Sequence, residues 1–148
     1  ASMVLILVVS VAIPTWKSYR DAEPLLALEQ LEAIQWLQVN TPKEAAIVAT
    51  NYDAPWVLGW SERRVIAPGL FEWNRHNQQE WEQFLRATEV EQAKNFFDQY
   101  DGPLYLYRSG TNNSFNYLAE EKFAPPYFQV VYDQSGARIF AYFPGEND

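Results

Sequence analysis

The feature that most constrains the fold is an apolar run, MVLILVVSVAI, which extends from Met3 to Ile13. Ser10 is the one polar residue in this run, and Pro14 follows it directly. A helix that crosses a bilayer needs about 20 consecutive apolar residues, so this run is too short to cross one alone. So much apolar surface must still be covered by lipid or by protein.

Three interpretations of the apolar run are open. It can be the end of a membrane helix, because the segment WKSYR at residues 16–20 follows it, and aromatic and cationic side chains gather where a helix leaves the hydrocarbon. It can be a buried strand, because most of its residues are β-branched. It can also be a secretory signal, with Ser10 and Ala12 as the small residues before cleavage, although the positive leading segment is missing.

We favour the membrane helix, and we therefore expect a chain of two parts. Residues 1–20 are the end of a transmembrane helix with an interface linker, and residues 21–148 are a soluble α/β domain. The whole chain has 148 residues and 48% hydrophobic residues, which suits one globular domain with its own core.

Charge and composition exclude several classes of function. The net charge of −8 argues against nucleic acid as a partner, and also against electrostatic docking on anionic lipid. The chain has no Cys and a single His, His76, so a disulfide framework, a thiolate metal site and a multi-histidine metal site are excluded. We expect no metal and no cofactor in this chain.

Helical and strand patterns alternate along the domain. The spacing of Leu28, Leu31 and Ile34 predicts an amphipathic helix that begins near Pro24 and stops at Thr41, which precedes a proline. The further expected elements are a strand at 45–50, a short helix within 51–62, a strand at 63–69, helices at 79–88 and 90–100, a strand at 102–110, a short helix near 115–122 and a hairpin at 127–143. This order predicts an α/β fold: a three-layer sandwich with a mostly parallel central sheet and a C-terminal antiparallel hairpin.

Four stretches carry a resemblance to a known family. They are AIQWLQVNTPKEAAIVATNYD, VLGWSERRVIAPG, AKNFFDQYDGPLYLY and FQVVYDQSGARIFAYF. Over roughly residues 25–143 the chain resembles the soluble C-terminal extracytoplasmic domain of type C glycosyltransferase-like polytopic membrane proteins. This group includes oligosaccharyltransferases and dolichyl-phosphate-mannose mannosyltransferase-like enzymes.

The resemblance implies a function for the domain. It would lie on the extracytoplasmic side of a membrane protein that uses lipid-linked sugar, and it would help to position the acceptor or substrate. In that family the catalytic and metal-binding acidic residues lie in loops between membrane helices, so the present chain would be inactive alone. Its partners would be the membrane part of the same polypeptide and a lipid-linked sugar or acceptor glycan.

Other readings of the chain stay open. The apolar N-terminal segment could hide its surface against a second copy and give a dimer. A free-standing periplasmic carbohydrate- or solute-binding module is the alternative function, and it requires a complete signal peptide upstream. A soluble α/β enzyme is the least favoured class, because one His and no Cys leave few groups for a catalytic pair.

The first group of candidate substrate-binding residues follows the strand expected at 45–50. It consists of Asn51, Tyr52, Asp53 and Trp56. Ligands in open α/β sheets bind outside the carboxyl ends of the strands, which favours this position. In oligosaccharyltransferases the matching strand leads into Trp-Trp-Asp-Tyr-Gly, which recognises the acceptor peptide; Asp53 matches by position, but the Trp pair and the Tyr-Gly are absent. The alternative role of Asp53 is to cap the following helix.

The second candidate group lies in the segment GLFEWNRHNQQEW at residues 69–81. It consists of Glu72, Trp73, Arg75 and His76. An aromatic face with amide and carboxylate groups is what a sugar site uses, because the ring stacks on the sugar and the polar groups bind its hydroxyls. The alternative is a solvated loop whose aromatic residues pack inward. We expect no catalytic residue in either group.

Overall fold

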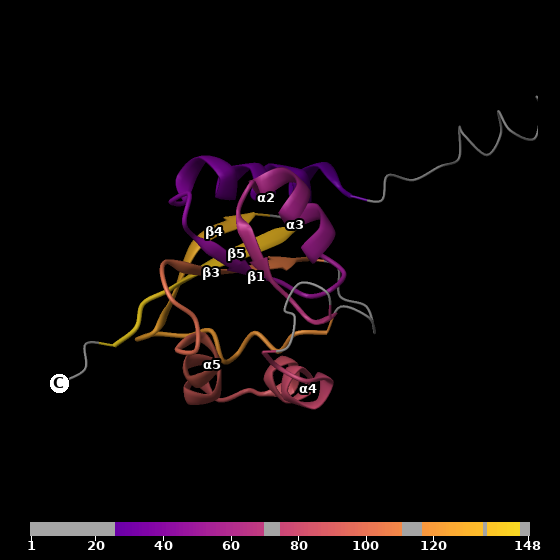
Figure 1. Ribbon diagram of the computed structural model, residues 1–148. Coiled ribbons are helices and arrows are strands. Elements are labelled where there is room, and N and C mark those ends of the chain that lie inside the picture. The colour runs from indigo at the N-terminus through magenta and orange to yellow at the C-terminus, as the bar shows by residue number, and fades with distance from the viewer. Residues whose placement is uncertain (1–25, 70–74, 111–116, 135, 146–148) are drawn as a thin grey trace, which may run out of the picture.

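The computed structural model describes residues 26–69, 75–110, 117–134 and 136–145, and its helices and strands follow one another as the sequence predicts (Figure 1). The elements are α2 (Leu28–Asn40), β1 (Ala46–Val48), α3 (Ala54–Ser61), β2 (Arg64–Ile66), α4 (Gln78–Arg86), α5 (Val90–Phe97), β3 (Leu104–Ser109), β4 (Phe128–Gln134) and β5 (Ala137–Tyr142). Each expected element except the short helix near 115–122 has a counterpart of the same type among them.

The strands form one open mixed sheet with the order β2-β1-β3-β5-β4. At its parallel core, β1 pairs with β2 and with β3, so that Ile47 lies beside Val65 and Tyr105. The last two strands are antiparallel: β5 pairs with β3 on one side and with β4 on the other. The expected α/β fold with a parallel core and a C-terminal antiparallel hairpin is confirmed.

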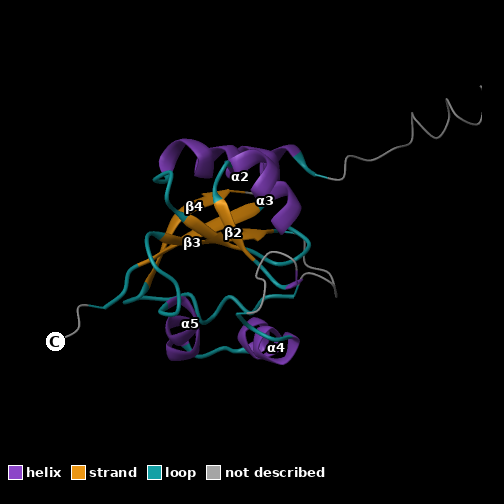
Figure 2. Cartoon of the chain, in the orientation of Figure 1, coloured by secondary structure: helices purple, strands orange, loops and turns teal. Residues whose placement is uncertain are grey.

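The sheet is the middle of three layers. Helices α2 and α3 cover one face, and α4 and α5 cover the other (Figures 1 and 2). Side chains of a strand alternate between the two faces, so Ala46 and Val48 join the core on the α4–α5 side while Ile47 joins the core on the α2–α3 side. The three-layer arrangement is therefore a consequence of strands that are apolar on both sides.

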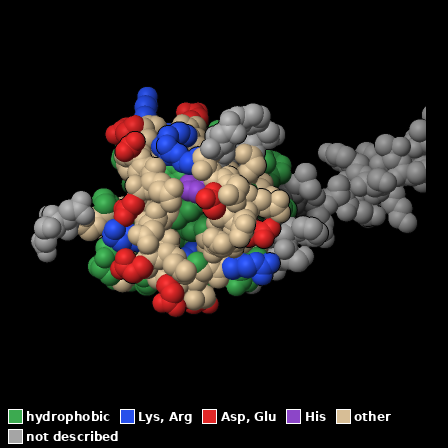
Figure 3. Space-filling model, turned by 60° about the horizontal axis from the view of Figure 1, so that its bottom comes forward, with side chains coloured by type: hydrophobic (Ala, Val, Ile, Leu, Met, Phe, Trp, Pro, Cys, Tyr) green, Lys and Arg blue, Asp and Glu red, His purple; other side chains and the backbone are tan. Residues whose placement is uncertain are grey.

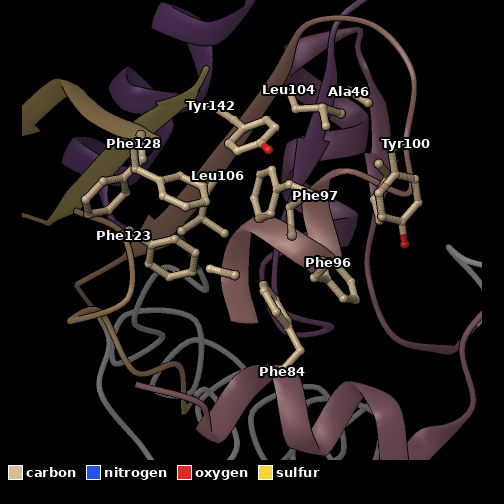
Figure 4. Close-up of a cluster of buried hydrophobic side chains, with 14 of the residues drawn as sticks. Ala46, Phe84, Phe96, Phe97, Tyr100, Leu104, Leu106, Phe123, Phe128 and Tyr142 are labelled. Carbon is tan, nitrogen blue, oxygen red and sulfur yellow. The ribbon is translucent and has the colours of Figure 1, made fainter. Parts of the chain in front are cut away.

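Aromatic side chains fill the space between the sheet and the α4–α5 layer (Figure 4). The rings of Phe84 and Phe96 stack with centroids 3.9 Å apart, which ties α4 to α5. Phe97 meets Phe128 edge to face at 5.1 Å, which ties α5 to the sheet. Much of the aromatic surplus of the sequence therefore lies in this core.

The helix ends follow from local sequence. Helix α2 ends where Thr41 precedes a proline, and the Thr41 hydroxyl donates to the Leu37 carbonyl over 2.6 Å. Helix α4 begins with a capping box: the Asn77 side chain accepts from the Glu80 amide at 3.0 Å, and the Glu80 carboxylate accepts from the Asn77 amide at 2.7 Å.

The short helix expected near 115–122 is wrong over its described part, residues 117–122, which form a loop with a turn. Donors of this segment form hydrogen bonds with carbonyls at the end of α4 and not with carbonyls of a local helix. The Ala119 amide donates to the Leu85 carbonyl at 3.0 Å, and the buried Lys122 ammonium donates to the carbonyls of Phe84, Leu85 and Ala87. These tertiary bonds outweigh the local helical preference.

The interpretations of residues 1–20 concern a part of the chain that lies outside the described residues, and so does the dimer expected from the apolar segment. Within the residues that the structure describes, no helix combines the length and the apolar character needed to cross a membrane.

Candidate functional site

The two predicted groups of site residues lie on different sides of the sheet. Asn51, Tyr52 and Asp53 follow β1, and Trp56 packs against the core beneath α2 and α3. His76 packs instead against the aromatic core of the α4–α5 layer. Glu72 and Trp73 lie outside the described residues, so of the second group the structure describes only Arg75 and His76.

Asp53 is used within the fold. It is 3% exposed, and its carboxylate accepts from the Ser109 hydroxyl at 3.0 Å and from the Thr50 hydroxyl at 3.2 Å. Since Ser109 ends β3 and Thr50 follows β1, this carboxylate joins the carboxyl ends of two parallel strands. The expected cap on α3 is wrong, because the Asp53 side chain makes no capping bond to that helix.

The other members of the first group lie at the surface. Asn51 is exposed, the Tyr52 side chain is 41% exposed, and Trp56 is half-buried in α3. They lie beyond the carboxyl end of β1, where the sequence places them. Neither pocket described below includes any of the three in its lining.

Both ring nitrogens of His76 are engaged. Nε2 lies 2.8 Å from Oε1 of Gln99, and Nδ1 lies 3.1 Å from the hydroxyl of Tyr100. The ring also stacks on Phe96, with centroids 4.8 Å apart. Contacts on its face and on both nitrogens fix the orientation of the imidazole.

Arg75 contacts the same two residues as His76 does, namely Gln99 and Tyr100. Its guanidinium lies 4.9 Å over the centre of the Tyr100 ring and donates to the Gln99 carbonyl at 3.1 Å. Arg75 and His76 thus fasten the chain before α4 to the residues that follow α5.

A groove of about 300 Å³ lies between α4 and α5 beside His76. In Figure 3 the purple histidine marks this area on the face formed by the two helices. The groove is lined by His76, Glu80, Gln83, Phe84, Ala87, Gln92, Asn95, Phe96 and Gln99. Four carboxamides, one carboxylate and one imidazole therefore face a space with two phenyl rings in its wall, and we call it the amide groove.

The side chains that line the amide groove suit a neutral polar ligand. A carboxamide both donates and accepts hydrogen bonds, as a sugar hydroxyl does. The lining contains neither Lys nor Arg, so it offers no counter-charge to a phosphate or a carboxylate.

The carboxamides of this groove are the residues that the sequence analysis did not single out. Gln83, Gln92, Asn95 and Gln99 look like the solvated faces of two helices. The available signal was the spacing of Gln92, Asn95 and Gln99, which places them along one side of a helix.

A second groove, of about 350 Å³, lies beside the β4–β5 hairpin. Its charges pair with one another: Glu120 bridges Arg108 and Arg138, and Asp133 lies 2.9 Å from Arg138. The two arginines sit opposite each other in the β3–β5 register, which explains why a carboxylate is needed between them. We interpret this network as structural.

No group of three or more His, Asp or Glu side chains in the described part of the chain could hold a metal ion. Comparison with known proteins gives no match: no family model, no curated protein and no solved structure matches this chain. Fold and site therefore define its class, a three-layer α/β domain with an amide-lined groove between two helices.

Proposed function

We propose that this chain is an extracytoplasmic domain of a polytopic, glycosyltransferase-like membrane protein, and that its amide groove holds the sugar part of an acceptor or substrate. The observation that carries the proposal is the lining of this groove, which combines four carboxamides, Glu80 and His76 without a cation. The resemblance of residues 25–143 to such domains supplies the membrane context.

A sugar presents hydroxyl groups and C–H groups, and the lining of the groove offers partners to both. Neighbouring hydroxyls present donors and acceptors in pairs, and carboxamides satisfy such pairs without a change of protonation. Phe84 and Phe96 also line the groove, but they are 5% and 6% exposed and stack on each other, so only their ring edges are available to the C–H groups of the sugar. A volume of about 300 Å³ is at the lower end of small-molecule sites, so the groove suits the end of a glycan and not a long internal stretch.

His76 acts in this proposal as a positioning residue. Its nitrogens face Gln99 and Tyr100, which leaves the imidazole as a fixed part of the wall. The reaction itself belongs to the membrane part of the same polypeptide, and the domain contributes binding and orientation.

Calorimetry tests the groove directly. The 148-residue chain in detergent micelles is titrated with neutral hexose and N-acetylhexosamine oligosaccharides, and with anionic sugars for comparison. We expect binding of a neutral sugar, and a loss of about tenfold or more in affinity when Gln92→Leu and Asn95→Leu remove two hydrogen-bonding groups.

The matched control is Gln35→Leu, which removes an exposed carboxamide from α2 on the other side of the sheet. This control should leave sugar affinity unchanged. Binding of anionic sugars alone, or equal losses in the control and in the groove variant, would contradict the proposal.

The free-standing carbohydrate-binding module remains the alternative, because the amide groove favours it equally. The reading frame upstream of Ala1 separates the two. A long upstream sequence with many apolar segments supports the membrane protein, whereas a start codon with a signal peptide close to Ala1 supports the free-standing module.

A further inference from the structure

Helix α3 has an unusual outer surface. Its sequence is APWVLGWS, and its one polar residue, Ser61, is fully buried. The side chains that point outward are consequently apolar, and Leu58 and Trp60 are each 49% exposed. With Tyr52 in the turn before the helix, they form a surface that we call the α3 face: Tyr52, Pro55, Trp56, Leu58 and Trp60.

The α3 face is continuous along the helix. Trp56 and Trp60 are four residues apart, so they are neighbours on one side of α3. Tyr52 precedes Trp56 by the same interval in the turn that leads into the helix. Two indoles and a phenol therefore follow one another along one flank of α3. Leu58 is two residues from each indole and lies on the opposite flank, next to Pro55.

The outer surface of α3 differs in character from that of α4. Every exposed residue of α4 is polar, as in a helix with one buried stripe: Gln78, Gln79, Glu80, Glu82, Gln83 and Arg86. A helix that is apolar both on its inner and on its outer side is typical of one that is covered on both sides. Helix α3 is covered by the domain on one side only.

The α3 face begins at the edge of the sheet where the chain enters the domain. Glu29, near the start of α2, lies close against Gly136 in the β4–β5 turn. The Gly110 amide donates to the Gly136 carbonyl at 2.7 Å, and the neighbouring Ser109 binds Asp53, which directly precedes α3. Helices α2 and α3 therefore start beside one another, at the carboxyl end of β3.

The distance from this edge to the expected membrane anchor is short. From Arg20, the last residue of the expected interface segment, to Leu26 is a step of six residues. Six residues of fully extended chain reach about 20 Å. An anchor at residues 1–20 would thus hold the start of α3 within a few nanometres of the lipid headgroups.

We infer that the α3 face docks on the headgroup region of the membrane. The inference rests on the membrane attachment in the proposed function. Trp and Tyr are the side chains that collect at this depth, because an apolar ring with one polar group suits an environment that is half hydrocarbon and half water. Helix α3 carries no charge that would have to enter it, and a net charge of −8 makes neutral lipid a better partner than anionic lipid.

This docking defines which substrate the amide groove meets. Helices α3 and α4 lie on opposite faces of the sheet (Figure 1), so a domain that rests on α3 turns its α4–α5 layer away from the bilayer. The amide groove then takes the water-side end of an acceptor glycan, and the lipid-linked sugar remains with the membrane part.

Site-directed spin labelling tests the inference, because the chain has no cysteine and a label can be placed at one position at a time. Leu58→Cys places the label on the α3 face, and Gln92→Cys places the control label in the α4–α5 layer. Both chains are reconstituted in phosphatidylcholine vesicles. We expect the label at 58 to lose collisions with a water-soluble nickel complex and to gain collisions with oxygen, while the label at 92 stays fully accessible to nickel. Trp60→Glu, added to Leu58→Cys, should restore the nickel collisions.

Three results would overturn the inference, and they differ in what else they affect. If the chain does not sediment with the vesicles, the membrane attachment in the proposed function fails as well. If it sediments but position 58 is as open to nickel as position 92, the docking alone fails. If labels at 58 broaden one another's spectra more strongly at higher protein-to-lipid ratio, a second copy covers the α3 face in place of lipid.

Discussion

At the scale of single residues, Lys122 is the clearest case of a polar group placed for the fold. It is fully buried, and it donates to the carbonyls of Phe84, Leu85 and Ala87 at the end of α4. The last carbonyls of a helix lack partners within it, and the Lys122 side chain supplies donors to them. We expect Lys122→Met to lower the free energy of unfolding by about 3 kcal/mol, because three carbonyls lose their donor. Urea denaturation measures this, and a loss below about 1 kcal/mol would contradict it.

The same residue predicts a pH dependence. Burial lowers the pKa of Lys122 from its ordinary 10.5 to about 7. Between about pH 7 and pH 10.5 the unfolded chain binds more protons than the folded chain. The free energy of unfolding therefore increases as the pH rises through this range. The stability difference between the natural chain and Lys122→Met should therefore be larger at about pH 9.5 than at about pH 7. Burial raises the pKa of Tyr107 and of Tyr142, so these two phenols stay protonated in this window. A difference that stays constant or shrinks would show that the buried ammonium is not destabilised.

Asp53 allows a prediction that separates a structural from a binding role. Its carboxylate joins β1 to β3 through the Ser109 hydroxyl, so we expect Asp53→Asn to cost about 1–2 kcal/mol of stability. A double-mutant cycle with Ser109→Ala should give a coupling of about 1 kcal/mol. Asp133→Asn is the control, since its partner Arg138 lies at the surface and such pairs contribute about 0–1 kcal/mol. Sugar affinity should not change in Asp53→Asn, and a loss there without a loss of stability would return Asp53 to the binding site.

At the scale of elements, the start of α4 links stability to the proposed site. Asn77 caps this helix through a reciprocal pair with Glu80, and Glu80 also lines the amide groove. We expect Asn77→Ala to cost about 1 kcal/mol in urea denaturation and to weaken sugar binding in calorimetry, because the first turn of α4 loosens. Asn77→Ser keeps a capping oxygen and should restore both measurements. Weaker binding in both variants alike would mean that the amide itself touches the sugar.

Elements could be predicted from sequence wherever one periodic pattern decided them. The apolar spacing of α2 and the β-branched residues of β1 and β2 are local signals, and each element formed where they occur. The loop at 117–122 could not be predicted, because Lys122 and Ala119 bind carbonyls of α4 that are distant in sequence. The amide groove could not be predicted either, for the same reason. Gln83 and Gln92 belong to different helices, and only the packing of α4 on α5 brings them together.

At the scale of the whole molecule, the three layers could be predicted from the sequence. The placement of the two candidate groups on opposite faces of the sheet could not. Apolar strands that alternate with helices require helices on both faces of the sheet, and this arrangement is present. From the sequence, Trp56 and His76 are candidate substrate-binding residues in two separate groups. The structure places them on opposite sides of the sheet, because α3 covers one face of the sheet and α4 covers the other. The part near Trp56 is apolar and the part near His76 is polar, so the two candidate groups belong to two surfaces of different chemical character.

This division leads to the last prediction, which concerns the molecule as a whole. If the α3 face rests on the membrane, the amide groove on the other side of the sheet stays open to water. Affinity for a neutral oligosaccharide should then be the same for the chain in phosphatidylcholine vesicles and in detergent micelles, as measured by calorimetry at equal concentrations of accessible protein. The variant with Gln92→Leu and Asn95→Leu should lose affinity equally in both. A sugar that binds in micelles but not in vesicles would mean that the α4–α5 layer faces the bilayer, and the domain would have to be turned over.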